Sequence, residues 1–328
     1  MKIKSKSRKN DSSFAGLSSP LPGSYAATSK AISGPVQYKS RNWDDLAFVF
    51  FFVAVLGTFI FETSIVVPKI YSKDFHSSAG PVIHYITGFF ILHNILGNFV
   101  QIIRHQSTIK GKLLLFSNQP SSSFSSKTSS ANNQRYCFTC ETYLPPRSYH
   151  CSSCGVCILK RDHHCTFARA CIGYDNYRYF LALIFYISIG SLYVSILNMF
   201  FIWDLLGGFT FYNFMSHTFP FIFWLFGLLH WYSTMCCLIS IINIAAFLFT
   251  TGLVFYHGSM VIANQTVHER AKSITDFDLG NWRSNVEQTF GSRWILTFIS
   301  PIIYSKLPGN GKDFPSKRDY NLNSPKTK

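Results

Sequence analysis

The chain has 328 residues, of which 48% are hydrophobic and 17% aromatic, and only 14% carry a charge. An average soluble domain has about 25% charged residues, and this apolar composition excludes a disordered chain. The net charge of +15 favours acidic partners, namely nucleic acid, anionic lipid or a polyphosphate ligand.

The first 45 residues begin MKIKSKSRKN, continue rich in Ser, Pro, Gly and Ala, and contain no apolar run. This pattern predicts a flexible basic tail and no signal peptide. Its early positive charges suit anionic lipid on the cytosolic face, although a solvated chain explains them equally well.

Four apolar runs are long enough to cross a membrane, because a hydrocarbon core of about 30 Å needs roughly 20 residues of helix. They lie at residues 46–68, 80–103, 179–202 and 235–257. The last run lies in an uncharged stretch, 218–256, that is too long for one helix. This stretch can hold one helix with a membrane-dipping loop or two short helices.

The Lys and Arg residues are concentrated in alternate segments between these spans. Residues 1–45 hold 8 Lys and Arg, the segment between the second and third spans holds 10, and the C-terminal segment holds 10. The first short loop holds 2 and the loop after the third span holds none. Because positive flanks stay cytosolic, this predicts both termini and the central segment in the cytosol. A basic stripe interleaved with aromatics is missing from the sequence, which argues against nucleic-acid binding.

Seven of the nine cysteines fall between Cys137 and Cys171, in the predicted cytosolic segment. Zinc takes four Cys or His ligands, and each Cys-x2-Cys pair supplies half a site. The spacing predicts two interleaved structural zinc sites: Cys137, Cys140, His150 and Cys157 in one, and Cys151, Cys154, His164 and Cys171 in the other.

One Cys and one His remain outside these sites. Cys165 and His163 lie two residues apart, and Asp162 precedes them. A thiolate nucleophile, an imidazole base and an orienting carboxylate form a set suited to covalent catalysis. The alternative is a zinc-binding interaction module with an incidental extra ligand. The basic residues Lys160, Arg161, Arg169 and Arg178 near Cys165 favour an anionic substrate.

The Asp162 to Cys165 block within this ligand pattern resembles the DHHC-type protein S-acyltransferases, or palmitoyltransferases. The resemblance runs almost without gaps from Tyr136 to Phe180, and includes Pro146-Arg147 and Cys171-Ile172-Gly173-Tyr174. Residues 264–269 resemble the family's Thr-Thr-x-Glu motif, and residues 279–291 its Asn-containing C-terminal motif. The resemblance covers about residues 45–300. It implies an all-α polytopic membrane protein with four transmembrane helices and a cytosolic domain binding two zinc ions between the second and third.

The resemblance implies ping-pong acyl transfer from a fatty acyl-CoA, such as palmitoyl-CoA, to cysteines of substrate proteins near the membrane. Cys165 is then the nucleophile, His163 the general base and Asp162 its orienting group. Four basic residues are the expected contacts of the CoA phosphates: Arg147, Lys160, Arg161 and Arg178. The acyl chain needs an apolar tunnel among the spans, where Gly190 either sets the tunnel length or serves close helix packing.

Several positions depart from the family pattern. Thr166 and Phe167 stand where Pro-Trp is usual, Arg169-Ala170 replace Asn-Asn, and Val267 replaces a Thr. These changes keep open a catalytically weakened zinc scaffold in the membrane. A transporter is the third hypothesis, based on His84, His93 and His230 in apolar runs.

The predicted organisation has six parts. They are a tail (1–45), two spans (46–103), a linker (104–135), the zinc-binding catalytic domain (136–178), two further spans with a luminal loop (179–257) and a cytosolic C-terminal segment (258–328). The family resemblance implies the Golgi or endoplasmic reticulum membrane. We also expect Glu269, just after the fourth span, to cap or brace the zinc domain.

Overall fold

The computed structural model describes residues 42–72, 79–109 and 135–317. Most of the predicted N-terminal tail, most of the linker and the last eleven residues lie outside these ranges. All described residues belong to one unit of the chain, residues 34–328.

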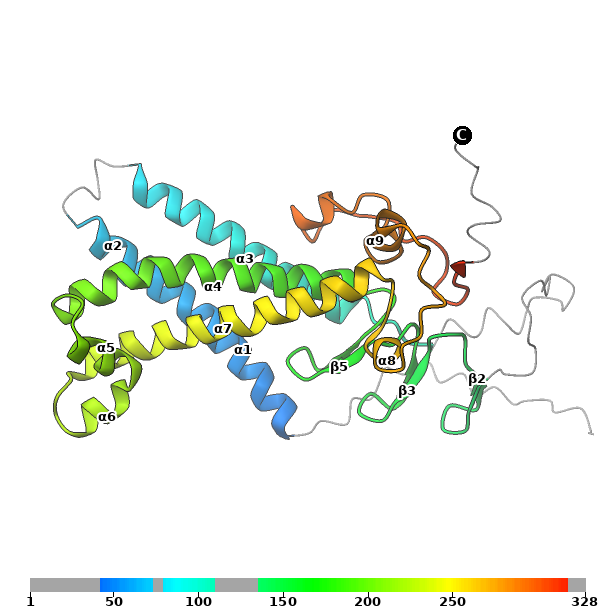
Figure 1. Cartoon of the computed structure of the whole chain (residues 1–328), viewed down its shortest axis with the longest axis horizontal. Helices are drawn as coiled ribbons and strands as arrows, with labels where there is room; N and C mark the ends of the chain where they lie inside the picture. Colours follow the sequence, from blue (N-terminus) through cyan, green and yellow to red (C-terminus); the bar gives the residue numbers. More distant parts are fainter. Residues whose placement is uncertain (1–41, 73–78, 110–134, 318–328) are drawn as a thin grey trace, which may run out of the picture. The chain divides into compact units, whose positions relative to one another are not determined.

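Four helical spans are long and apolar enough to cross a membrane among the described residues, which confirms the predicted number. The first is α1 (Asn42–Phe61), which continues through the π-helical turn η1 (Glu62–Val66) into α2 (Val67–Ile70); the others are α3 (Gly80–Arg104), α4 (Tyr177–Leu206) and α7 (Trp231–Ile262) (Figure 1). Helix α4 makes its most extensive contacts with α7 and then with α3.

The spanning helices are longer than the apolar runs predicted. Helix α4 has 30 residues and α7 has 32. At 1.5 Å per residue these helices are about 45–48 Å long, whereas the hydrocarbon core is about 30 Å thick. Both helices are therefore longer than the core is thick, and the end of each that lies near the cysteine-rich segment carries residues that belong to the site described below.

Two short helices precede the last span, α5 (Phe211–Thr218) and α6 (Pro220–Leu225). The Thr210 hydroxyl accepts a hydrogen bond from the Asn213 N–H and caps α5, and Pro220 opens α6, where a missing N–H has no cost. Neither helix is long enough to span. The uncharged stretch 218–256 thus contains a short helix and most of one span, and the fourth span begins at Trp231.

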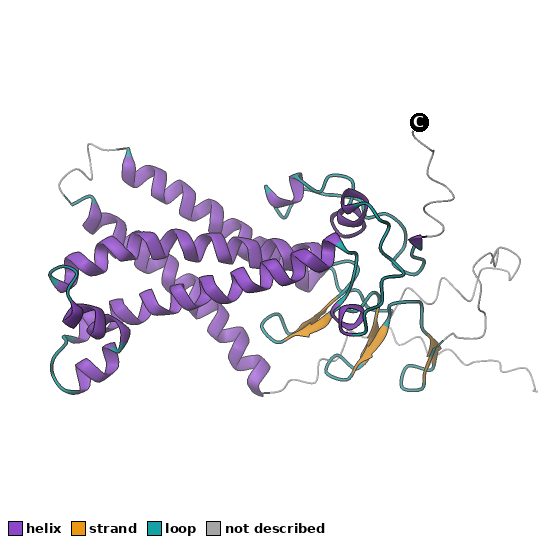
Figure 2. Cartoon of the chain, viewed as in Figure 1, coloured by secondary structure: helices purple, strands orange, loops and turns teal. Residues whose placement is uncertain are grey.

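The cysteine-rich segment forms three antiparallel hairpins of very short strands (Figure 2). The pairs are β1 (Tyr136–Cys137) with β2 (Thr142–Tyr143), β3 (Tyr149–Cys151) with β4 (Val156–Ile158), and β5 (His163–Cys165) with β6 (Ala170–Ile172). In register, His150 faces Cys157 and His164 faces Cys171. The hairpins thus bring predicted metal ligands opposite each other.

A shared core joins the third hairpin to the membrane helices. Ile172 of β6 packs in one cluster with Phe99 and Ile102 of α3 and with Phe180 of α4. Asn176, fully buried, donates hydrogen bonds to the backbone oxygens of Ile102 (3.1 Å) and Cys171 (3.0 Å). These contacts fix the hairpin against the C-terminal end of α3 and the N-terminal end of α4.

The segment after α7 contains α8 (Val267–Ala271), α9 (Trp282–Phe290) and the 3-10 turn η3 (Leu296–Phe298). Thr266 and Glu269 form a reciprocal capping box at the start of α8. The buried Asn285 side chain donates to the Ile262 oxygen (2.7 Å) and accepts from the Leu279 N–H (3.0 Å), which ties α9 to the end of α7.

Candidate active site and metal centres

Two clusters of three cysteines and one histidine have the predicted membership. In the first cluster, Nδ1 of His150 lies 3.6, 3.3 and 3.6 Å from the sulfurs of Cys137, Cys140 and Cys157. In the second cluster, Nδ1 of His164 lies 3.7, 3.4 and 3.7 Å from the sulfurs of Cys151, Cys154 and Cys171.

These distances fit tetrahedral zinc. Bonds of about 2.3 Å to sulfur and 2.0–2.1 Å to nitrogen separate neighbouring ligand atoms by about 3.6 Å. The carboxylate of Asp44 in α1 lies 3.9 Å from Nε2 of His164, the nitrogen that faces away from the cluster. A carboxylate near the outer ring nitrogen is common at metal-binding histidines. The residues present therefore fit the ion.

The two ligand sets repeat with a constant offset of 14 residues. Each ligand of the first set, Cys137, Cys140, His150 and Cys157, has its counterpart in the second, Cys151, Cys154, His164 and Cys171. A third repeat would begin at Cys165, but Ala168 stands where its second cysteine would be. Cys165 consequently belongs to neither cluster.

Strand β5 separates the metal ligand from the catalytic candidates. Successive side chains of a strand point to opposite faces, so His163 and Cys165 share one face and His164 takes the other. In the structure His164 joins the second cysteine cluster, whereas His163 and Cys165 both line the same cavity. A three-residue strand thus places a metal ligand beside a base and a thiol.

Asp162 and His163 form the expected pair. Oδ2 of Asp162 lies 2.8 Å from Nδ1 of His163, and Oδ1 accepts a hydrogen bond of 2.9 Å from the Val267 N–H. Burial lowers the pKa of the His163 imidazole, but the hydrogen bonds with Asp162 and Cys165 outweigh burial and raise the pKa to about 9. The raised pKa favours the protonated form of the His163 imidazole.

A cavity of about 700 Å³ opens beside these residues and extends between the spanning helices. His163, Cys165 and Phe180 line the end of the cavity near the hairpins, and most of its wall is apolar. Gly190 and Leu197 of α4 line it further along the helix. A Cβ atom on Gly190 would lie 2.9 Å from Cγ2 of Ile91, so this glycine both borders the cavity and permits close packing of α3 on α4.

His257 of α7 was not anticipated from the sequence. Its Nδ1 lies 3.8 Å from Oδ2 of Asp162 and 3.0 Å from the Tyr177 hydroxyl. The residue lies at the end of an apolar run and more than 90 residues beyond Asp162 in sequence, so no local spacing indicated it. An ionisable residue near the end of a span was the one available signal.

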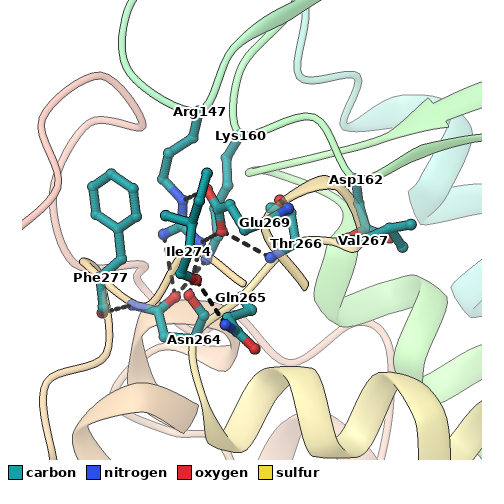
Figure 3. A network of polar contacts seen from close by, with 10 residues as sticks. All are labelled: Arg147, Lys160, Asp162, Asn264, Gln265, Thr266, Val267, Glu269, Ile274 and Phe277. Carbon is teal, nitrogen blue, oxygen red and sulfur yellow. Dashed lines mark hydrogen bonds and ion pairs between the residues drawn. The ribbon is translucent and has the colours of Figure 1, made fainter. Parts of the chain in front are cut away.

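A buried polar network braces the hairpins from the C-terminal side (Figure 3). The Arg147 guanidinium donates to both carboxylate oxygens of Glu269, at 2.8 and 2.7 Å, and to the backbone oxygen of Asn264, at 2.8 Å. Lys160 donates to the Asn264 side chain (3.1 Å). The expectation that Glu269 braces the zinc domain is confirmed.

The four basic residues expected at CoA phosphates differ in their surroundings. Arg147 and Lys160 are buried in the network of Glu269 and Asn264, and burial lowers the pKa of Lys160 well below its ordinary value. Arg178 is buried and donates to the Ser305 backbone oxygen and to the Tyr179 hydroxyl. Arg161 is partly exposed.

Two of the residues that differ from the family pattern, Val267 and Arg169, make specific contacts in the structure. Val267 contacts Asp162 through its backbone N–H, a hydrogen bond that needs no side-chain hydroxyl. Arg169, in the turn between β5 and β6, forms an ion pair of 2.9 Å with Asp45 of α1. The turn that follows Cys165 is thereby connected to the first span.

Comparisons with known proteins agree with this site. The family model described as DHHC palmitoyltransferase matches residues 130–274. Probable palmitoyltransferase ZDHHC24 of Danio rerio is 32% identical over 233 residues, covering 71% of this chain and 75% of the relative. The Homo sapiens protein of the same name is 33% identical, covering 70% and 77%. Palmitoyltransferase ZDHHC22 of Danio rerio is 26% identical, covering 83% and 96%.

Proposed function

The chain belongs to the DHHC palmitoyltransferase family, and from this premise we propose how its residues transfer an acyl group. Its activity is that of a protein S-palmitoyltransferase. The observation that carries the proposal is the juxtaposition of Cys165, His163 and Asp162 at the mouth of a long apolar cavity.

In the first half-reaction the Cys165 thiolate attacks the thioester carbonyl of a fatty acyl-CoA. The new bond joins the acyl carbon to the Cys165 sulfur, the bond to the CoA sulfur breaks, and His163 gives its proton to the CoA sulfur, so that CoA leaves as a thiol and His163 is neutral. His163 keeps Cys165 ionised by holding the proton, and Asp162 fixes the ring through its hydrogen bond at Nδ1.

In the second half-reaction a cysteine thiol of a substrate protein attacks the acyl-Cys165 thioester. His163 accepts the thiol proton, the acyl carbon bonds to the substrate sulfur, and Cys165 leaves as a thiolate. The two steps share one site and therefore follow a ping-pong order. Substrate cysteines near the membrane surface suit this position, because Cys165 lies in the hairpin packed against the ends of the spans.

The cavity accommodates the acyl chain. A saturated chain with C–C bonds of about 1.5 Å and angles of about 111° advances about 1.25 Å per bond, so a palmitoyl chain is about 19 Å long. Phe180 and Leu197, both at the cavity wall, are 17 residues apart on α4, or about 26 Å at 1.5 Å per residue. The cavity wall is thus long enough for a 16-carbon chain.

The CoA phosphates require cations on the cytosolic side. We propose Arg161 as the first contact, because it is partly exposed beside the catalytic residues. Contacts to Arg147, Lys160 or Arg178 would require these buried side chains to exchange their present partners. The metal in each Cys/His cluster is proposed to be zinc, which would supply a rigid crosslink between short hairpins.

The proposed setting is the Golgi or endoplasmic reticulum membrane, with both termini in the cytosol. The distribution of Lys and Arg supports this orientation, as does the position of the cysteine clusters beside the ends of the spans. A reducing cytosol keeps the thiols of the clusters and of Cys165 unoxidised.

The test is an acylation assay on the purified protein. Wild type and a Cys165→Ser variant are incubated with fluorescent palmitoyl-CoA, and label on the protein is tested for release by hydroxylamine. We expect a hydroxylamine-sensitive label on wild type alone. No label on a folded wild type that contains two zinc ions would favour the weakened scaffold instead.

A further inference from the structure

His257 contacts the catalytic pair from the membrane side. It belongs to α7, whereas Asp162 and His163 belong to the hairpin region, and only 5% of its side chain is exposed. Its ring centroid lies 5.5 Å from that of His163, and its Nδ1 lies 3.8 Å from the Asp162 carboxylate. This histidine has no part in the two half-reactions described above.

Two aromatic residues of α4 hold His257 in place. The Tyr177 hydroxyl is 3.0 Å from Nδ1 of His257, and the Phe180 ring packs edge-on against it at 5.0 Å. Phe180 also packs edge-on against His163, at 4.9 Å. The imidazole of the catalytic base is therefore bordered by Phe180 from α4 and His257 from α7.

The same His257 side chain lines the cavity proposed for the acyl chain. Leu253 and Thr250, one and two turns before His257 on α7, line the cavity as well. A chain that fills the cavity therefore packs against a residue that also contacts Asp162 and His163. Among the described residues His257 thus connects the chain-binding region to the base and its carboxylate.

We propose that His257 is a positioning residue that couples occupancy of the acyl cavity to the alignment of Asp162 and His163 with Cys165. This inference rests on the proposed function. With a long chain in the cavity, His257 is held between the chain and Tyr177, and the Asp162 carboxylate keeps one orientation. With a two-carbon acetyl group, which ends close to Cys165, the cavity beside His257 stays open, so His257 has room to move and the pair is less well aligned.

The coupling has a kinetic consequence. Contacts with a remote part of a substrate raise the rate of the chemical step when they are used to position the reacting groups. An enzyme with this coupling acylates Cys165 faster with long-chain donors even at saturating donor. A cavity that only binds the chain changes the half-saturating donor concentration and leaves the saturated rate constant unchanged.

The experiment measures single-turnover acylation of the full-length, zinc-containing protein with acetyl-CoA and palmitoyl-CoA over a range of concentrations. Wild type is expected to show a higher saturated rate constant with palmitoyl-CoA. His257→Ala should lower that rate constant about 10- to 100-fold, because small misplacements of catalytic groups have effects of this size. The variant should also lose the difference between donors in rate constant while keeping the difference in half-saturating concentration.

Three further variants separate positioning from a general structural effect. His257→Asn keeps a polar atom near the position of Nδ1 and should recover a large part of the palmitoyl rate. Tyr177→Phe removes the hydroxyl partner and should give an intermediate loss. His93→Ala removes an imidazole from α3 that contacts Ser300 and not the catalytic pair, and it should react like wild type. Zinc content and melting temperature are measured for each.

The outcomes are distinguishable. Equal saturated rate constants for both donors in wild type would overturn the coupling, as would an undiminished palmitoyl rate in His257→Ala. A uniform loss with both donors, together with lower melting temperature and no recovery in His257→Asn, would assign His257 a structural role and overturn the coupling as well. An unlabelled wild type with either donor would instead contradict the proposed function.

Discussion

Cys165 stays free of metal because the 14-residue ligand pattern ends there. Cys137 and Cys151 each begin a ligand set whose second cysteine follows three residues later, whereas Cys165 is followed at that distance by Ala168. The thiol is therefore not used in a closed zinc site, where it would be a ligand rather than a nucleophile. Its neighbours still hold the backbone rigid, because His164 and Cys171 belong to the second cluster.

Asp162 uses each carboxylate oxygen to accept a hydrogen bond from a different donor, His163 on one side and the Val267 N–H on the other. Asparagine has one acceptor oxygen, so in Asp162→Asn one of these donors must face an NH₂ group. We expect acylation of Cys165 to fall at least about 100-fold. Single-turnover labelling measures the rate, and zinc content should remain at two ions. A variant that labels as fast as wild type would contradict the orienting role.

Removing one partner of the ion pair between Arg147 and Glu269 should strongly lower the stability of the protein. The two side chains are 0% and 3% exposed. Arg147→Met leaves the Glu269 charge buried without its counter-ion, which typically costs about 3–5 kcal/mol of unfolding free energy. Chemical unfolding of the zinc-loaded protein in detergent measures this loss. The double variant with Glu269→Leu should be closer to wild type than Arg147→Met.

The ion pair between Arg169 and Asp45 provides the matched control. Its partners are 36% and 43% exposed, and exposed pairs contribute about 0–1 kcal/mol. Asp45→Asn should therefore lower the unfolding free energy by less than about 1 kcal/mol. If both pairs gave similar losses, burial would not be the reason for the effect at Arg147.

The site residues that could be predicted from the sequence are those set by short intervals along the chain. The eight ligands and the Asp162–His163–Cys165 set follow from intervals of a few residues, and the structure brings them together. The environment of Arg147 and Arg178 depends on residues more than 100 positions away, such as Glu269 and Ser305. No local pattern shows that a cation will be buried by such partners, and His257 escaped notice for the same reason.

The hairpin β5–β6 carries two residues of the second Cys/His cluster and also Cys165, the proposed nucleophile. His164 and Cys171 face each other across the hairpin, and Cys165 is the next residue after His164. Cys154→Ser, which removes a ligand of this cluster, should lose one zinc ion and lower acylation more than Cys140→Ser, which changes the cluster away from β5. Metal content and labelling rate are measured in parallel. Equal labelling by the two variants would show that both clusters support the nucleophile alike.

Helix α4 forms part of the wall of the cavity proposed to hold the acyl chain. Gly190 lies on its wall, and a Cβ atom there would already approach Ile91 of α3 to 2.9 Å. Gly190→Phe should place a ring in the cavity and shift donor preference toward chains shorter than palmitoyl. Competition between C14, C16 and C18 acyl-CoA donors measures the preference, and Gly252→Phe, where a Cβ meets open space, is the control. An unchanged preference would remove Gly190 as a determinant of chain length.

The existence of the spans was predictable from hydropathy, but their ends were not. The apolar run that predicted residues 179–202 corresponds to a helix from Tyr177 to Leu206, because Tyr177 and Arg178 are buried in helical conformation at one end and the helix continues to the left-handed Gly207 at the other. The three hairpins were not predicted, because strands of two or three residues leave no periodic pattern. Ligand spacing indicated the metal sites without indicating the strands that build them.

Positive residues and exposed aromatic residues lie in different segments of the chain. Of 30 Lys and Arg residues, 28 lie in the three segments predicted to be cytosolic. The segment with α5 and α6, between the third and fourth spans, has no Lys or Arg and carries many exposed aromatic side chains, including Phe209, Phe211 and Trp224. Such a surface suits the membrane interface on the luminal side, where aromatic residues accumulate.

This distribution of Lys and Arg predicts on which side of the membrane each segment lies. Both termini should be cytosolic and the turn at Gly207–Gly208 luminal, because positive flanks resist translocation and the apolar segment does not. Epitope tags at either end should be detected in cells whose plasma membrane alone is permeabilised. A tag inserted after Gly208, where a Cβ meets open space, should be detected only after the internal membranes are opened. A terminal tag detected only after full permeabilisation would contradict the orientation and would put Cys165 on the side opposite to cytosolic acyl-CoA.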